Sequence, residues 1–104
     1  MSIDAKHRDA FLRAWGLRPQ EANLLALLWQ ANGRVLRYAF LADALPKYHE
    51  RETPDPAYVK VLLCLLRGKM KNRDHIRTLW GAGLALTESG REACQEAIDA
   101  YVSL

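Results

Sequence analysis

The sequence predicts a mainly helical domain with one small β-hairpin near its C-terminal end. Apolar residues recur at helical spacing over most of the chain, and glycine and proline divide it into short segments. The spacing changes to that of strands only over residues 75–87. A chain of 104 residues holds one hydrophobic core, so we expect a single domain over residues 1–104.

The composition is typical of a globular protein. Half of the residues are hydrophobic and 26% are charged, which excludes wholesale disorder. No apolar run approaches the roughly 20 residues that cross a bilayer, and the first residues lack the apolar stretch of a signal peptide. We therefore expect a cytoplasmic protein without a membrane partner.

Two helices are predicted in the first third of the chain. The first covers about residues 4–15 and ends at Gly16. Its apolar face consists of Ile3, His7, Ala10, Phe11, Ala14 and Trp15. The second helix begins at Pro19, which suits the first turn of a helix, and ends near Asn32.

A shorter third helix is predicted over about residues 38–45. Pro46 ends it, because proline cannot continue the helical hydrogen bonds. The next residues, 47–55, are mostly polar and contain a further proline, so we expect a loop there.

The fourth helix is the longest, over about residues 56–72. Asp55 suits the N-cap and Pro56 the first helical position. The stripe expected to face the core consists of Val59, Leu63, Leu66 and Met70. Three further apolar residues lie outside this stripe, so the helix is apolar nearly all round. They are Val61, Leu62 and Leu65.

A β-hairpin and a final helix complete the predicted fold. Strands over residues 75–80 and 84–87 flank a turn of small residues at 81–83. The final helix covers about residues 88–102, with one apolar face and its acidic residues on the other side. The core of the fold is thus expected over about residues 17–87, with an added helix at each end.

No residue grouping indicates a metal, a cofactor or catalysis. Cys64 and Cys94 lie within apolar stretches without the spacing of metal ligands, so we expect buried free thiols. His7, His49 and His75 stand singly, and the chain shows no Ser/His/Asp grouping or paired carboxylates. We therefore expect a protein that is not an enzyme.

The positive charge of the chain is concentrated in one segment. The net charge is +3 and the isoelectric point about 9.1. Residues 67–77 alone carry five cations and one anion, whereas residues 88–104 carry one cation and four anions. This distribution favours a polyanionic partner for the first segment and not for the second.

The order of these elements is typical of a winged helix-turn-helix protein. In that fold the longer helix lies in the major groove of DNA, and the hairpin, or wing, touches the neighbouring backbone or minor groove. Three cations of the basic segment fall at the end of the fourth helix, where phosphates flank a helix inserted in a groove.

Four blocks of sequence then resemble the OmpR/PhoB-type DNA-binding domain of bacterial response regulators. They read LRPQEANLLALL over residues 17–28, GRVL over 33–36, VKVLLCLLRGKM over 59–70 and IRTLWGAGLAL over 76–86. The family patterns are L-T-P-x-E-x-x-L-L-x-x-L, G-R-V-V, V-D-V-x-I-x-x-L-R-x-K-L and I-x-T-V-x-G-x-G-Y-x-L. The blocks occur in the family's order and spacing.

The resemblance implies sequence-specific binding of double-stranded DNA and control of transcription, in a bacterial, nucleoid-associated protein. The family's recognition-helix positions fall on Tyr58, Lys60, Val61, Leu62, Leu65 and Arg67. Its wing positions fall on Arg77, Thr78 and Trp80, and its phosphate contacts before the short helix on Arg37 and Tyr38. The loop at residues 45–55 corresponds to the segment through which some relatives touch RNA polymerase.

Three further cations join this expected DNA surface by their position alone. They are Lys69, Lys71 and Arg73. Arg18 and Arg37 stand where relatives cap a helix with Thr or Ser, which places positive charge at a positive helix end. A bound phosphate would remove that conflict, but arginines that simply point into water explain the same residues.

The chain also departs from the family pattern. We expect a stand-alone domain without a receiver domain, with a helix in place of the family's N-terminal sheet. Leu62 and Leu65 replace polar readers, so recognition is expected to depend on thymine methyl groups, DNA shape and phosphate charge. We expect a homodimer, because paired half-sites raise the affinity of a domain with few base-reading side chains.

One alternative follows from the apolar fourth helix. A terminal helix or a second copy of the protein would then cover Val61, Leu62 and Leu65 and remove the DNA surface. The chain would in that case be a protein-interaction or dimerisation module of winged-helix fold that has lost DNA binding.

Overall fold

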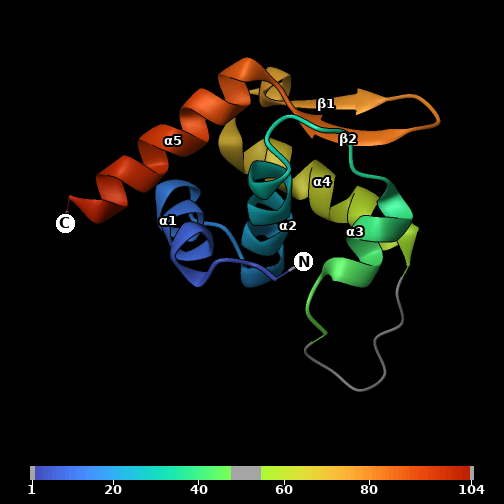
Figure 1. Cartoon of the computed structure of the whole chain (residues 1–104), viewed down its shortest axis with the longest axis horizontal. Helices are drawn as coiled ribbons and strands as arrows, with labels where there is room; N and C mark the ends of the chain where they lie inside the picture. The colour runs from blue at the N-terminus through green and yellow to red at the C-terminus, as the bar shows by residue number, and fades with distance from the viewer. Residues whose placement is uncertain (1, 48–54, 104) are drawn as a thin grey trace.

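The computed structural model describes residues 2–47 and 55–103. Within these residues, five helices and one antiparallel hairpin follow one another (Figure 1). The elements are α1 (Ala5–Trp15), α2 (Pro19–Gln30), α3 (Tyr38–Ala44), α4 (Pro56–Met70), the 3-10 turn η1 (Arg73–His75), β1 (Ile76–Leu79), β2 (Gly83–Leu86) and α5 (Glu88–Val102). The mainly helical fold with a small hairpin and added terminal helices is thus confirmed.

Capping residues fix the predicted ends of the helices. The carboxylate of Asp4 accepts a hydrogen bond of 2.8 Å from the amide of Lys6 and so caps α1. α1 ends where Gly16 adopts the left-handed conformation, with φ 62°. Asp55 caps α4 in the same way, because its carboxylate accepts from the amide of Ala57 at 2.9 Å.

α4 ends two residues earlier than predicted. Lys71 adopts the left-handed conformation with φ 58°, and its amide donates to the carbonyl oxygen of Arg67. Asn72 then caps η1, since its side chain accepts a hydrogen bond of 2.9 Å from the amide of Asp74. The chain therefore turns immediately after α4 and leads into the hairpin.

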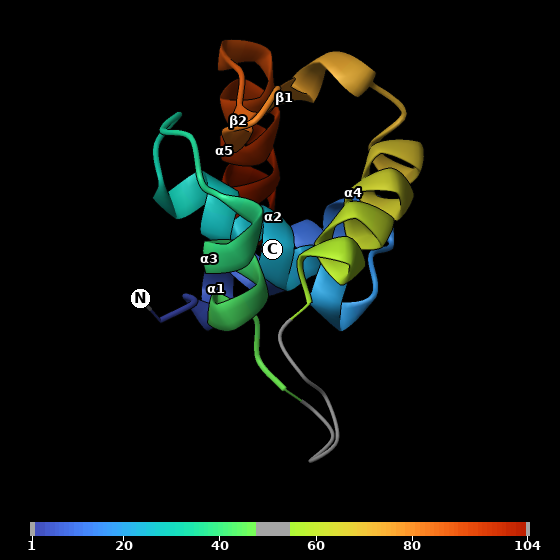
Figure 2. The same ribbon diagram turned by 90° about the vertical axis from the view of Figure 1, so that its right-hand side faces the viewer.

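α2 is the central helix of the fold. Every residue from 21 to 28 is buried. α1 packs against α2 and α5, whereas α3 packs against α4, which in turn packs against α2. Figures 1 and 2 show α2 between the pair α1 and α5 and the pair α3 and α4. The core thus lies around α2.

The hairpin is fastened to the segment that precedes α3. β1 and β2 pair antiparallel, with Ile76 opposite Leu86. Leu36 joins Leu84 through two backbone hydrogen bonds of 2.8 and 2.9 Å. Gly83 is required at this junction, because φ is 147° and a Cβ atom would collide with the carbonyl oxygen of Leu36. The position of the wing is therefore set in part by the segment that precedes α3.

β1 is shorter than predicted, and β2 begins and ends one residue earlier than predicted. His75 belongs to η1 and Trp80 to the turn, so neither lies in β1. Thr87 lies outside β2, because its hydroxyl oxygen caps α5 by accepting a hydrogen bond of 3.2 Å from the amide of Gly90. Local capping thus takes these end residues from the strands.

Two predictions about burial are wrong. Cys64 is exposed, because it lies on the outward face of α4 although its sequence neighbours are apolar. Leu62 is only 4% exposed, because α4 packs against both α2 and α3 and its buried face is wider than one stripe. The predicted stripe itself is buried, and so is Cys94. Burial raises the pKa of the Cys94 thiol to about 12.

None of the described helices is both long enough and apolar enough to cross a membrane. Within the described residues, no three His, Cys, Asp or Glu side chains gather where they could hold a metal ion. Most of the predicted loop, residues 48–54, lies outside the described residues.

Candidate nucleic-acid interface

One face of α4 is bare. Val61 is 55% exposed and Leu65 46%, and Lys60 and Cys64 are exposed beside them. α2 and α3 pack on the other side of α4, and α1 and α5 pack against each other beyond α2 (Figure 2). The alternative in which a terminal helix of the same chain covers this face is therefore wrong.

The bare face has a basic side and an apolar side. Lys60, Cys64 and Gly68 succeed one another at steps of four residues and form the basic side, together with the cations of neighbouring elements. Tyr58, Val61 and Leu65 are displaced around the helix and form the apolar side, next to the start of α2. One helix thus presents two surfaces of different chemistry.

Two hollows that share Lys60 extend along the basic side. One, of about 490 Å³, lies between the start of α3, α4 and the hairpin, and the other, of about 310 Å³, lies between α4 and η1. We call them together the basic cleft. Its principal residues are Arg37, Tyr38, Lys60, Cys64, Arg67, Gly68, Arg73, Thr78 and Trp80. Among the described residues no acidic side chain lines either hollow, so the four cations give the cleft a positive potential.

Lys60 lies at the centre of the basic cleft. Its Nζ atom is 5.4 Å from the centroid of the Tyr38 ring, which is a cation–π distance. The contact connects the first turn of α3 with the middle of α4 and restrains the ammonium group. Lys60 is otherwise exposed, so its charge is available to an anion that enters the cleft.

Arg67 fastens the hairpin to α4. Its Nη2 atom donates to the carbonyl oxygen of Ile76 at 2.7 Å and to the hydroxyl of Thr78 at 2.9 Å. Both partners lie on β1. Arg67 therefore fixes the distance between the helix and the wing, and its charge contributes to the field of the cleft from a restrained position.

Two residues of the predicted DNA surface point away from it. Lys69 donates to Glu21 Oε1 at 2.7 Å, and Glu21 is only 1% exposed, so this lysine is turned toward α2. Leu62 lies in the core and presents no side chain at the surface. Their assignment to the DNA surface is corrected, because the packing of α2 on α4 takes both side chains inward.

The comparisons with known proteins identify the family. The family model described as "Transcriptional regulatory protein, C terminal" matches residues 13–86, which is more than half of the chain. The chain belongs to this OmpR/PhoB-type family of DNA-binding domains. No curated protein and no solved structure matches it. The family consists of DNA-binding transcriptional regulatory domains and is not a family of enzymes.

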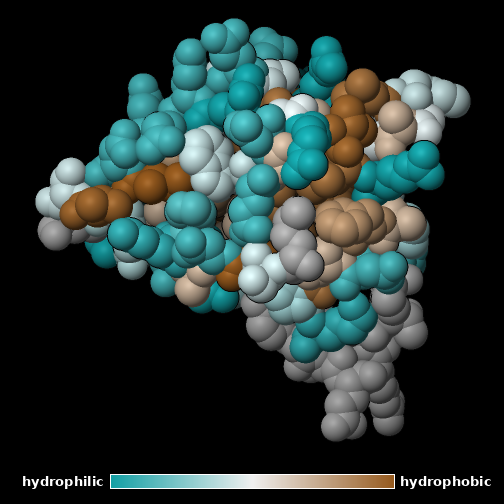
Figure 3. Space-filling view, viewed as in Figure 1, coloured by the Kyte–Doolittle hydropathy of each residue, from teal (hydrophilic) through white to brown (hydrophobic). Residues whose placement is uncertain are grey.

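The match ends with β2 and begins near the end of α1. The four blocks that suggested an OmpR/PhoB-type domain lie within it, and the resemblance is thus confirmed. α5 and most of α1 lie outside the matched residues. Figure 3 shows mainly polar surface over α5 in this view, with apolar side chains gathered near its C-terminal end, where Val102 is 57% exposed.

The wing residues of this OmpR/PhoB-type domain are open to solvent. Trp80 is 100% exposed at the turn between the strands, and Arg77 and Thr78 are exposed on β1. Lys71 is exposed just after α4, and Arg73 lines the basic cleft from η1. Of these residues, Arg73, Thr78 and Trp80 line the basic cleft, whereas Lys71 and Arg77 are not among its lining residues.

The two arginines at N-cap positions lie on different surfaces of the domain. Neither side chain caps its helix. Arg37 lines the basic cleft, whereas Arg18 lies beside the apolar side of α4. The amide of Arg18 donates instead to Glu21 Oε1 at 2.9 Å. The side chain of Glu21 thus satisfies the backbone N–H group at the N-cap of α2. Only Arg37 shares a surface with Lys60.

Two residues that line the basic cleft were not predicted from the sequence. Cys64 and Gly68 follow Lys60 at steps of four residues, and these small residues line the hollow beside it. That spacing was visible in the sequence, because residues four apart lie on one helical face. The apolar neighbours of Cys64 led instead to the prediction that it is buried.

Proposed function

We propose that this OmpR/PhoB-type domain binds specific duplex DNA sequences with α4 in the major groove and the hairpin on the adjacent backbone or minor groove. The observation that carries the proposal is the basic cleft, which lies along the bare side of α4 and is lined by no acidic residue in the part of the chain that the structure describes. A helix with this environment combines access to base edges with charge for the phosphates on either side.

The proposed phosphate contacts come from several elements. Arg37 precedes α3, Lys60 lies on α4 and Arg73 on η1, and the exposed Lys71 and Arg77 lie just after α4 and on β1. Each contact releases counterions from the DNA, so the affinity falls steeply with salt. The slope of log affinity against log salt concentration is about −0.9 for each phosphate contacted. Arg67 supports this surface by holding the hairpin.

Base reading is proposed to depend on few hydrogen bonds. Val61 and Leu65 supply apolar contact for thymine methyl groups, and Cys64 is small. Tyr58 in the first turn of α4 and Trp80 at the hairpin turn offer exposed aromatic surface. Specificity then arises mainly from methyl contacts and from DNA shape, and less from hydrogen bonds to base edges.

The first prediction tests this assignment by neutralising two cations of the basic cleft and, as a control, two cations elsewhere. A duplex selected from a random pool is titrated with the wild-type chain and with a Lys60→Gln/Arg73→Gln variant at two salt concentrations. We expect the slope of log affinity against log salt to fall by about 2, because two phosphate contacts are lost. Affinity near physiological salt should fall at least about tenfold.

The control removes the same charge elsewhere. Lys6→Gln/Arg13→Gln acts on α1, away from the cleft, and should change the affinity less than about twofold. A folded Lys60→Gln/Arg73→Gln variant that keeps the wild-type affinity and slope would contradict the proposed interface. Absence of DNA binding at low salt would favour the protein-interaction module instead.

Two partner predictions remain predictions. Contact with RNA polymerase was expected through residues 45–55, of which 48–54 lie outside the described residues. The homodimer was expected from paired half-sites, and sedimentation of the free and DNA-bound chain tests it directly.

A further inference from the structure

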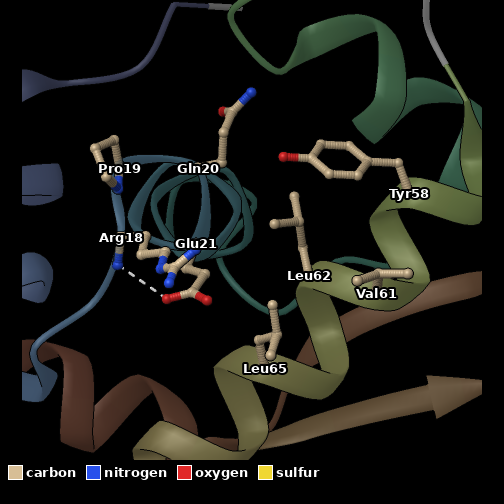
Figure 4. Close-up of a pocket in the computed structure, with 8 residues that line it drawn as sticks. All are labelled: Arg18, Pro19, Gln20, Glu21, Tyr58, Val61, Leu62 and Leu65. Atoms are coloured by element: carbon tan, nitrogen blue, oxygen red, sulfur yellow. Dashed lines mark hydrogen bonds between the residues drawn. The ribbon is translucent and has the colours of Figure 1, made fainter.

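The apolar side of α4, whose Val61 and Leu65 are proposed to contact thymine methyl groups, also borders a cavity beside α2. The cavity measures about 400 Å³ and lies between the first turn of α2 and α4 (Figure 4). It is lined by Arg18, Pro19, Gln20, Glu21, Tyr58, Val61, Leu62 and Leu65. Its volume lies within the range of pockets that bind small molecules, about 300 to 1,000 Å³.

The wall formed by α4 is apolar. Leu62 is buried at its base, and Val61, Leu65 and Tyr58 each leave between 43% and 55% of their surface exposed around it. Three large apolar side chains that are partly exposed on one helix and surround one cavity form a patch of the kind that marks binding surfaces. Burial of this patch by a ligand is favourable.

The wall formed by α2 contains a buried carboxylate with one unused oxygen. Glu21 Oε1 accepts both the amide of Arg18 and Nζ of Lys69, at 2.9 and 2.7 Å. Glu21 Oε2 is buried and has no hydrogen-bond partner among the described residues. Figure 4 shows this second oxygen turned from Arg18 toward Leu65. Buried polar atoms of folded proteins almost always have a partner, so the site lacks a donor.

A second copy of the chain is a poor occupant for this cavity. Stable protein interfaces involve about 20 to 30 residues a side, whereas eight of the described residues line this site. Contact here would also bring two α4 helices within about 10 Å of each other. Successive major grooves are about 34 Å apart, so such a dimer does not fit the DNA binding proposed above.

We propose that this cavity binds a small, flat, apolar molecule that carries one N–H or O–H donor. The flat surface packs against Val61, Leu62 and Leu65, and the donor satisfies Glu21 Oε2. The bound molecule lies on the apolar side of α4, so the site is distinct from the basic cleft on the neighbouring side of the same helix.

Two probes that differ in the donor test the proposal. Indole has one N–H group, and 1-methylindole has the same ring system without it. Each is titrated into the full chain with methyl-labelled Val and Leu, without DNA, and followed by NMR. Indole should shift the Val61 and Leu65 methyl signals saturably with a Kd on the order of 1 mM, as expected for a fragment of this size. We expect 1-methylindole to bind at least about fivefold more weakly.

A pair of valine variants locates the site. Val61→Lys should abolish the binding of indole, whereas Val102→Lys on α5 should leave it unchanged. The two valines match in exposure, at 55% and 57%, so either substitution is compatible with folding. Glu21→Gln should lower the affinity for indole to that for 1-methylindole, because an amide N–H₂ replaces the unpaired oxygen.

Several outcomes would overturn the proposal. They are no saturable shift with indole, equal affinity for the two probes, or equal effects of the two valine variants. Methyl shifts that depend on protein concentration without a probe, together with a dimer in sedimentation, would show that a second copy occupies the groove. Because no DNA is present, each of these results leaves the DNA-binding proposal to its own test.

Discussion

Four cations of α4 and η1 have different surroundings, although the sequence predicted all of them on one DNA-binding surface. Lys60 lies against the Tyr38 ring and Arg73 lines the cleft. Arg67 binds β1, and Lys69 binds Glu21. Two of the four therefore stabilise the fold of the free domain, and two are available to an anion.

The second prediction concerns Lys69. Lys69→Met removes the ion-pair partner of Glu21 and leaves a carboxylate that is only 1% exposed. We expect the free energy of unfolding to fall by about 3 kcal/mol, because an uncompensated buried charge is strongly destabilising. Urea unfolding measures the change. Lys71→Met serves as control and should stay within about 0.5 kcal/mol, since Lys71 is exposed.

The third prediction concerns Arg67. Arg67→Met removes the hydrogen bonds to the Ile76 carbonyl and the Thr78 hydroxyl and should destabilise the domain by about 2 kcal/mol. Thr78→Val removes only one of them and should cost less. Amide hydrogen exchange should show loss of protection concentrated in the hairpin. Uniform loss over all elements would contradict a local role for Arg67 in holding the wing.

At the scale of elements, helix α1 depends on its cap. The hydrogen bond from the Lys6 amide lowers the pKa of Asp4 below its ordinary value of 3.8, and the neighbouring His7 lowers it further. A lowered pKa means that the folded helix favours the ionised carboxylate. The stabilisation by this cap is therefore complete above the unfolded pKa and is lost as the pH falls through the folded value.

The fourth prediction follows from this sign. The amide resonance of Lys6 should titrate with Asp4, at a pH below the ordinary value of an aspartate, and α1 should fray at its N-terminus as the cap is protonated. NMR spectra recorded from neutral to acid pH measure both. Asp4→Asn keeps a capping side chain but cannot ionise, so the step should vanish. A step that persists in this variant would show that another group causes it.

At the scale of the whole molecule, the two cysteines differ in burial. Cys94 is buried between α5 and the core, and its pKa of about 12 keeps the thiol protonated at neutral pH. Cys64 is exposed on the basic side of α4. A thiol reagent should therefore modify Cys64 in the native chain and both cysteines only after unfolding.

The fifth prediction uses Cys64 to locate bound DNA. If α4 enters the major groove, a selected duplex should slow the reaction of Cys64 with a thiol reagent at least about fivefold, by covering it. A Ser103→Cys variant in a Cys64→Ser background places an exposed thiol at the end of α5 as control. Its reaction rate should stay unchanged. Equal rates for Cys64 with and without bound duplex would contradict the proposed orientation.

Much of this architecture was predictable because its signals are local. Asp4 and Asp55 begin helices, Gly16 ends one, and the glycines at 81 and 83 mark the hairpin turn. The strand ends were less predictable. Thr87 and His75 belong to neighbouring elements, because the Thr87 hydroxyl caps α5 and His75 ends a 3-10 turn, although the amide of Thr87 still donates to the carbonyl oxygen of His75 at 3.0 Å.

The candidate site was predictable only in part. The sequence identified α4, Lys60 and the wing, but it also included Leu62 and Lys69 and predicted Cys64 as buried. The directions of these side chains depend on which helices pack against α4. Glu21 and Lys69 are 48 residues apart, and no local pattern announces their ion pair.

The amino-acid sequence by itself determined the order of the elements, the family and the location of the positive charge, because each follows from residue types at short spacing. The tertiary structure alone decided which charges are available to a ligand and where the cavity beside α2 lies. The physical reason is that a helix has several faces, and only the packing of α2, α3 and the hairpin around α4 selects those that remain exposed.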